Sequence, residues 1–111
     1  MRSGDILRVD FGIPVGSTPA FVRPAVVVTA DQTLSLYTRT MHVVPVTTDV
    51  ERPWATDVPL AGSGLSKDSA AQCHLCAVID FTQVVAETGA NVGPVALSQI
   101  RSVLGDLLDI P

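Results

Sequence analysis

Apolar and polar residues alternate at the start of the chain, a pattern typical of β-strands that bury one face. In residues 4–11, Leu7, Val9 and Phe11 share one face, while charged residues occupy the other. This segment is therefore predicted to be a half-buried strand. A loop rich in glycine and proline, residues 12–22, follows it.

The second predicted strand, residues 23–29, is the segment around which the chain is organised. Its β-branched run from Val26 to Thr29 suits a pleated surface. Pro24 cannot donate a hydrogen bond to a sheet, so it is expected at the first strand position. The same proline pushes Arg23 into an extended conformation. Arg23 is thus predicted where an irregular loop meets a rigid strand, which would hold one guanidinium firmly.

Further strands are predicted in the middle of the chain. Residues 69–81 form the longest candidate, and Pro45 places another, residues 41–48, at an edge or a bulge. Residues 30–39 are polar and are predicted to be a loop, with or without a turn of helix. The remaining predicted segments are a turn around Pro53, a strand at 56–60, a turn at 61–64, one helical turn at 82–85, and a strand or loop at 86–92.

One helix is predicted at the end of the chain. Gly93 and Pro94 give a start signal, because proline is tolerated at the first helical position. Gly105 inside it costs on the order of 1 kcal/mol relative to alanine, which indicates close packing there. Apolar residues recur at helical spacing at Leu97, Ile100, Val103, Leu104, Leu107 and Leu108. Short strands and one terminal helix predict a mainly β, strongly bent small barrel, a single domain over residues 1–111.

Composition supports a folded domain with a partner. Hydrophobic residues make up 47% and charged residues 16%, which excludes disorder and suggests that a second copy covers some apolar surface. The net charge of -4 argues against broad adhesion to nucleic acid, but a groove can still gather a few of the seven Lys and Arg residues. Neither a membrane span nor a signal peptide is visible. The expected location is therefore the cytoplasm.

Cys73 and Cys76 form a C-x-x-C pattern. Zinc would need two further ligands, and only His42 and His74 are on offer. If residues 69–81 are an extended strand, the two cysteines point to opposite faces and can neither chelate nor bridge easily. The prediction is two unlinked thiols, with no metal and no cofactor.

Five short motifs, in this order and spacing, resemble the MazF/PemK/Kid toxins. They are Gly4-Asp5-Ile6, Val15-Gly16-Ser17, Arg23-Pro24-Ala25-Val26-Val27-Val28, Val43-Val44-Pro45-Val46-Thr47 and Asp68-Ser69. The resemblance covers nearly the whole chain and implies an SH3-like barrel with added helices. It also implies a homodimer with an RNA groove across its interface, neutralised by a cognate antitoxin. The implied activity is metal-independent, sequence-specific cleavage of single-stranded RNA, whether mRNA, tRNA or rRNA.

The resemblance places the catalytic arginine at Arg23 and the catalytic threonine at Thr47. In such a reaction the 2′-hydroxyl of the RNA attacks the neighbouring phosphate, leaving a 2′,3′-cyclic phosphate and a 5′-hydroxyl. The planar fork of Arg23 suits two phosphate oxygens, and Thr47 can add one hydrogen bond. Neither residue is a natural base.

His74 is the candidate acid or base, because Kid-like members place a catalytic acidic residue at this position. A histidine titrates near neutral pH, which suits proton transfer. In an extended strand His74 shares a face with Gln72, so the two would line one wall of the groove. The alternative is a half-buried sheet histidine.

The residues expected to bind RNA are Ser17, Thr18, Pro19, Thr48, Ser69 and Gln72. Trp54 either stacks on a base or an antitoxin residue, or caps the core. The chain departs from the family pattern at two places: one removes a candidate carboxylate, and the other removes a groove arginine and a threonine. The loss of the arginine would weaken phosphate contacts. Thr18 stands where most relatives have glutamate, and Leu75-Cys76-Ala77-Val78 replaces a Gln-Ile-Arg-Thr run.

Two other functions remain open. The first is a toxin of the same fold that poisons DNA gyrase by protein contact, like CcdB. That activity depends on a C-terminal end containing tryptophan, and residues 108–111 contain none. The second is a catalytically inactive binding module on the same scaffold, which the two departures from the family pattern allow.

Overall fold

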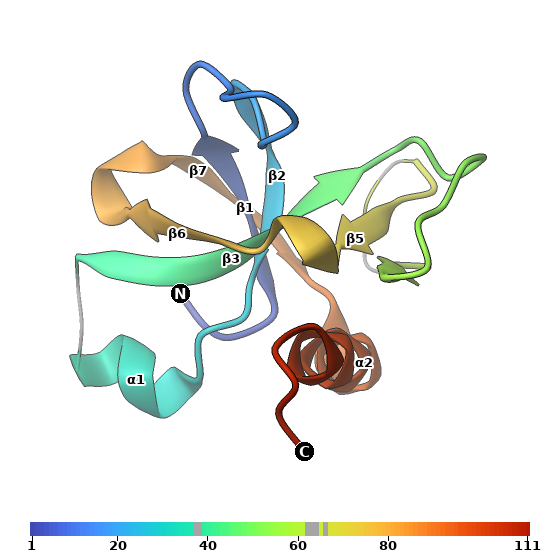
Figure 1. Ribbon diagram of the computed structural model, residues 1–111. Coiled ribbons are helices and arrows are strands. Elements are labelled where there is room, and N and C mark those ends of the chain that lie inside the picture. Colours follow the sequence, from blue (N-terminus) through green and yellow to red (C-terminus); the bar gives the residue numbers. More distant parts are fainter. Residues whose placement is uncertain (37–38, 62–64, 66) are drawn as a thin grey trace.

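A computed structural model describes residues 1–36, 39–61, 65 and 67–111. Seven antiparallel strands form a strongly bent sheet, and a C-terminal helix packs beneath it (Figure 1). The elements in chain order are β1 (Asp5–Asp10), β2 (Val22–Val27), α1 (Asp31–Leu36), β3 (Thr40–Thr47), β4 (Asp57–Pro59), β5 (Ala70–Gln72), the 3-10 turn η1 (Cys73–Leu75), β6 (Ala77–Asp80), the 3-10 turn η2 (Phe81–Gln83), β7 (Val84–Asn91) and α2 (Gly93–Leu107). The predicted fold class, a small barrel-like β domain with a terminal helix, is confirmed.

The strand order is β4-β5-β3-β2-β1-β7, and β6 also pairs with β3. The long strand β3 changes partners along one edge: Thr40 to Val43 pair with β6, whereas Val46 and Thr47 pair with β5. Pro45 lies between these two sets of pairs, so its missing N–H leaves no ladder bond unmade on that edge. The expectation of an edge strand is wrong, because β3 lies inside the sheet and Pro45 pairs with Ala25 of β2; Pro45 instead marks a change of strand partner on the other side.

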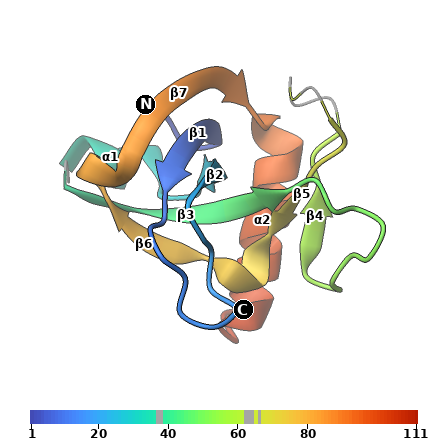
Figure 2. The same ribbon diagram turned by 90° about the horizontal axis from the view of Figure 1, so that it is seen from above.

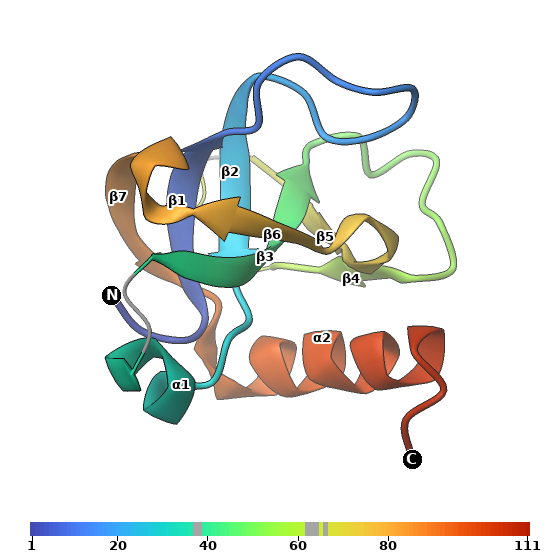
Figure 3. The same ribbon diagram turned by 60° about the vertical axis from the view of Figure 1, so that its left-hand side comes forward.

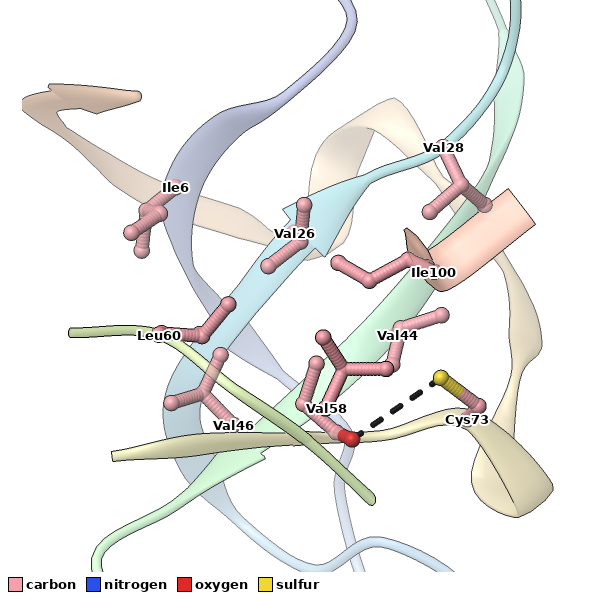
Figure 4. Packing of buried hydrophobic residues seen from close by; sticks show 10 residues of the cluster. Ile6, Val26, Val28, Val44, Val46, Val58, Leu60, Cys73 and Ile100 are labelled. Carbon is pink, nitrogen blue, oxygen red and sulfur yellow. Dashed lines mark hydrogen bonds between the residues drawn. The ribbon is translucent and has the colours of Figure 1, made fainter. Parts of the chain in front are cut away.

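Both faces of the central strands are buried, because neighbouring apolar residues point into two separate clusters. The first cluster lies between the sheet and α2 (Figure 4), and the second lies on the opposite face. Residues of the first are Ile6, Val26, Val28, Val44, Val46, Val58, Leu60, Ala71, Cys73 and Ile100, and those of the second are Leu7, Val9, Ala25, Val27, Met41, Val43 and Ile79. Strand β1 thus buries Ile6 as well as the predicted face.

The prediction of one strand over residues 69–81 is wrong. The chain forms β5, turns through η1 and continues as β6, and the N–H of Cys76 closes the turn by donating to the carbonyl of Cys73 at 3.1 Å. The break is tertiary in origin, since β5 and β6 pair with different halves of β3. Pro24 is the third residue of β2, not the first as predicted. It pairs with Arg8 of β1, whereas the pairing of β2 with β3 starts one residue later, at Ala25.

The smaller predicted elements are found with shifted ends. Helix α1 occupies part of the predicted loop 30–39, of which residues 37 and 38 lie outside the described part. Residues 62–64 of the predicted turn 61–64 also lie outside it. Strand β4, turn η2 and strand β7 fall close to their predicted places. In the described part of the chain, no helix is both long and apolar enough to cross a membrane.

Helix α2 runs lengthwise beneath the sheet, as Figure 3 shows, and it agrees with the prediction. Its end is tightly closed: Ile110 N–H donates to the Gly105 carbonyl at 2.7 Å, and Asp109 N–H donates to the Asp106 carbonyl at 3.2 Å. This is a Schellman ending, with Asp109 in the left-handed region at φ 55°. A Cβ on Gly105 would lie 3.3 Å from the Ile110 carbonyl oxygen, which agrees with the close packing predicted there.

Candidate functional site

A pocket of about 390 Å³ collects cations from three separate parts of the chain. Three of the seven Lys and Arg residues line it, and none of its described lining residues is acidic. We call it the cationic pocket. Its lining residues are Arg8, Arg23, Pro24, Val46, Thr47, Thr48, Leu65, Lys67, Ser69 and Thr88. In a chain with a net charge of -4, such a gathering indicates a site for an anion.

Arg23 is held at the start of β2 by the base of the preceding loop. Phe21 N–H donates to the Gly12 carbonyl at 2.7 Å, and Phe11 N–H donates to the Phe21 carbonyl at 2.8 Å. Phe21 itself has a left-handed φ of 53°, an uncommon conformation for a bulky residue. The loop is therefore closed by a strained residue two positions before Arg23, which fits a functional segment.

The guanidinium of Arg23 is fixed by two acceptors on the sheet. Its Nη2 donates to the carbonyl of Val46 at 3.1 Å and to Oε1 of Gln72 at 2.9 Å. The N–H groups on Nη1 and Nε have no partner among the described residues and are free for a ligand. Partial burial lowers the pKa of Arg23 from its ordinary value, and a desolvated guanidinium attracts an anion more strongly than one in water.

Thr47 ends β3 beside Arg23. Its Oγ1 accepts a hydrogen bond from the N–H of Asp49 at 3.1 Å, so the hydroxyl proton remains available for donation. Thr48 and Ser69 line the same pocket, and Ser69 Oγ donates to the carbonyl of Lys67 at 3.0 Å. The structure therefore brings together four of the residues singled out from the sequence, and a fifth, Gln72, contacts Arg23.

Sequence reasoning missed Arg8 and Lys67. Neither side chain has a hydrogen bond or ion pair with another described residue, so both charges are free to meet a ligand in the cationic pocket. Arg8 could have been found, because it lies on the polar face of the first predicted strand, and the neighbouring strand carries Arg23. No pattern in the sequence marks Lys67.

Ser17, Thr18 and Pro19 lie in the loop before β2 and do not line the cationic pocket. Thr18 is used within this loop: its Oγ1 accepts from the N–H of Val15 at 2.8 Å, and its own N–H donates to the Val15 carbonyl at 3.1 Å. The structure thus separates these three predicted RNA-binding residues from the other candidates.

The expectation that His74 lies in an extended strand is wrong, and with it the reason for placing His74 on one face with Gln72. His74 lies in η1, not in a strand, and faces a second cavity of about 750 Å³. We call this the apolar cavity; it lies between β3, η1, β6 and the end of α2. Its lining residues are Val28, His42, Cys73, His74, Cys76, Ala77, Val78, Leu104, Leu107 and Leu108.

The surroundings of His74 are well defined. Its Nδ1 lies 3.3 Å from Oγ1 of Thr56 and 3.9 Å from Oδ1 of Asp57, and its ring centroid is 4.9 Å from that of Trp54. Trp54 is 66% exposed, so it does not cap the core. Asp57 Oδ1 is buried and has no hydrogen-bond partner among the described residues.

Both cysteines are free thiols, as predicted, although the predicted reason was wrong because they lie in a turn and not in a strand. Burial, and then the negative charge of Asp57, raises the pKa of the Cys73 thiol to about 11. Its Sγ points into the first core cluster (Figure 4), toward the carbonyl of Ala71. In the described part of the chain, no group of three or more His, Cys, Asp or Glu residues could hold a metal ion.

A family model described as the PemK-like, MazF-like toxin of type II toxin–antitoxin systems matches residues 2–108. Among curated protein sequences, none is significantly similar.

Several solved structures share the fold. MazF from Deinococcus radiodurans is 24% identical with a TM-score of 0.83, over 99% of this chain and 97% of that one. A MazE–MazF structure from the same organism is 23% identical with a TM-score of 0.76, over 100% of this chain and 97% of that one. The Mycobacterium tuberculosis toxin MazF-mt6 is 20% identical with a TM-score of 0.76, over 96% of this chain and 98% of that one. Because the family model spans nearly the whole chain, this protein belongs to the PemK-like, MazF-like toxins of type II toxin–antitoxin systems.

Proposed function

We propose that this toxin is a metal-independent endoribonuclease that cleaves single-stranded RNA at the cationic pocket. The observation that carries the proposal is the composition of the pocket: Arg8, Arg23 and Lys67 meet there with the hydroxyl of Thr47 and no carboxylate among its described lining residues. A phosphodiester supplies the negative charge that such a pocket favours. Solved structures of the same fold include an endoribonuclease from mycobacterial species, 17% identical to this chain, which supports the reaction.

In the proposed reaction the 2′-oxygen of the RNA attacks the adjacent phosphorus, and the bond to the 5′-oxygen of the next nucleotide breaks. Negative charge grows on the non-bridging oxygens as the phosphorane forms. The free N–H groups of Arg23 and the hydroxyl of Thr47 donate to these oxygens, and they are already oriented by the sheet. Preorganised donors of this kind are usually the largest contribution to catalysis.

The proton lost by the 2′-hydroxyl and the proton gained by the 5′-oxygen cancel over the reaction. His74 is left out of the proposed catalytic pair, because it lines the apolar cavity and not the cationic pocket. The described lining residues of the cationic pocket also include no Asp, Glu, His or Cys that would hold a divalent cation. Cleavage is therefore expected to persist in EDTA.

We further infer two protein partners. Solved relatives include MazE–MazF structures and a mycobacterial endoribonuclease with its cognate antitoxin, which supports a cognate antitoxin for this chain. An acidic segment of that antitoxin would suit the cationic pocket and block the site. Because RNA is the proposed substrate, the toxin would act in the cytoplasm.

A second copy of the chain is the expected occupant of the apolar cavity, giving a homodimer. Val78 and Leu108 line this cavity and are 58% and 68% exposed. Neighbouring apolar side chains exposed to this extent indicate a surface that a partner covers. Sedimentation of Val78→Asp and Leu108→Asp should show monomers. Val95→Asp, on an exposed part of α2 outside the cavity, is the matched control and should leave the dimer intact.

The function is tested by incubating the protein with a mixed RNA pool in EDTA. The wild-type chain should cleave, and Arg23→Ala and Thr47→Ala should each lower the rate by at least about a hundredfold. Arg39→Ala and Thr33→Ala, exposed positions outside the cationic pocket, are matched controls and should cleave normally. Equal cleavage by all variants would contradict the assignment. Absence of cleavage with inhibition of gyrase would favour a CcdB-like toxin, and absence of both effects would favour an inactive binding module.

A further inference from the structure

We propose that Trp54 and His74 form a stacking site for one unpaired base of the RNA whose phosphate lies in the cationic pocket. This inference rests on the proposed RNA substrate and adds to it a site for a nucleobase. Trp54 is the only tryptophan of the chain, and it is 66% exposed. Its ring lies 4.9 Å from that of His74 at an interplanar angle of 31°. One aromatic ring thus supports another, whose remaining surface is open to a flat ligand.

The pair is held in place before any ligand binds. Trp54 N–H donates to Oδ2 of Asp57 at 3.1 Å, and Asp57 N–H returns a bond to the Trp54 carbonyl at 3.0 Å. His74 lies against the same turn through Thr56 Oγ1 at 3.3 Å and Asp57 Oδ1 at 3.9 Å. The side chain of Asp57 is 4% exposed; it fixes the backbone of Trp54 and lies close to the ring of His74. A ligand that stacks here loses little free energy to the ordering of the turn.

The aromatic pair is also connected to the proposed cleavage site. Asp57 is the cross-strand partner of Gln72, and the side chain of Gln72 accepts the hydrogen bond from Arg23. One strand pair and one side chain therefore connect Asp57, which fixes the backbone of Trp54, to the guanidinium that would hold the phosphate. The connection from β3 to β4, drawn in Figure 2, spans residues 48–56. It begins with Thr48, which lines the cationic pocket, and includes Trp54.

These observations favour a base over a protein side chain as the occupant. The backbone of a single RNA strand can follow the cations of the pocket while a neighbouring base turns onto the ring, a combination that recurs in single-strand binding. Stacking is tolerant of sequence, since every base has a π face. The site therefore contributes affinity near the cleaved bond more than it selects one base.

The single tryptophan makes the test direct, because all tryptophan emission comes from Trp54. The probe is a 2′-O-methyl RNA oligonucleotide of mixed sequence, which binds but offers no free 2′-hydroxyl. A second probe has the same backbone with abasic sites throughout. The first should quench Trp54 emission saturably and bind about tenfold more tightly than the second, which should not quench.

Substitutions separate stacking from folding. Trp54→Ala should lower affinity for the base-containing probe about tenfold and leave affinity for the abasic probe unchanged, whereas Trp54→Phe should retain part of the affinity. Phe81→Ala, at an exposed aromatic residue in η2, is the matched control and should bind both probes like the wild-type chain.

Equal quenching by both probes, or unchanged affinity of Trp54→Ala, would overturn the stacking site. So would emission that changes with protein concentration alone, together with loss of the dimer in Trp54→Ala, because the occupant would then be a second copy. The failure of the proposed nuclease looks different: the base-containing probe would stack on Trp54, but ordinary RNA would not be cleaved. If neither probe binds, both proposals fall.

Discussion

The hydrogen bond between Gln72 and Arg23 offers the sharpest test of how the cationic pocket works. Gln72→Leu keeps a similar volume but removes one of the two acceptors of the guanidinium, leaving only the Val46 carbonyl. A hydrogen bond to a charged group is worth about 1.5–3 kcal/mol. If the lower end of that range is lost from the transition state, kcat should fall about tenfold.

The Michaelis constant should change much less, within about twofold, because the charge of Arg23 still attracts the substrate while its orientation is lost. The assay is a double-mutant cycle of wild type, Arg23→Ala, Gln72→Leu and the combined variant, measured on one RNA substrate. In the Arg23→Ala background, Gln72→Leu should have no further effect. Gln32→Leu, an exposed glutamine on α1, is the matched control, and thermal unfolding of each variant reports its folding.

A different outcome would refute this reasoning. If Gln72→Leu lowers the rate equally with and without Arg23, Gln72 acts on the RNA directly, as expected from the sequence, and does not act through the guanidinium. Gln72→Glu gives an independent check, because its carboxylate keeps the acceptor but competes with phosphate for Arg23. That variant should raise KM with a smaller effect on kcat.

Three further predictions concern charge, pH and the end of the helix. Arg8→Ala should reduce the slope of log affinity against log salt by about 1 for a 2′-O-methyl RNA, and an unchanged slope would remove Arg8 from the RNA contacts. The pKa of Cys73, raised by burial to about 11, means that the folded chain keeps this proton longer than the unfolded chain, so stability should fall as pH rises from about 9 to 11. The full loss in the free energy of unfolding is about 3 kcal/mol and is measured by urea unfolding at each pH. Cys73→Ala should not lose stability over this pH range; an equal loss in the wild-type chain and the variant would mean that another group titrates. Asp109→Gly should relieve the left-handed φ of 55° and gain about 1 kcal/mol, or about 4 °C in Tm, whereas a lower Tm would contradict the proposed strain.

The sequence was sufficient for most of the fold because its strands and its helix have clear periods. Alternation in residues 4–11 predicted β1, the β-branched run after Pro24 predicted β2, and the apolar repeat after Gly93 predicted α2. The break at Cys73 could not be predicted in this way, because the apolar pattern continues through it. A turn is necessary there because β5 and β6 pair with different halves of β3, which only the folded sheet reveals.

The site was predictable only in part. Arg23 and Thr47 were found through their motifs, and both line one pocket. Placing His74 on a strand face followed from an incorrect secondary structure, since the residue lies in η1. Lys67 and the contact of Gln72 with Arg23 depend on pairs far apart in the chain, which local patterns do not report.

The central claim is that the 2′-hydroxyl attacks a phosphate held between Arg23 and Thr47. The most direct measurement uses one RNA substrate with a known cleavage position, and the same molecule with a single 2′-deoxy nucleotide 5′ to that bond. The account predicts that in EDTA the all-RNA substrate yields a 2′,3′-cyclic phosphate and a 5′-hydroxyl, whereas the deoxy substrate binds equally well and stays intact. Cleavage of the deoxy substrate, or products with a 5′-phosphate, would contradict it.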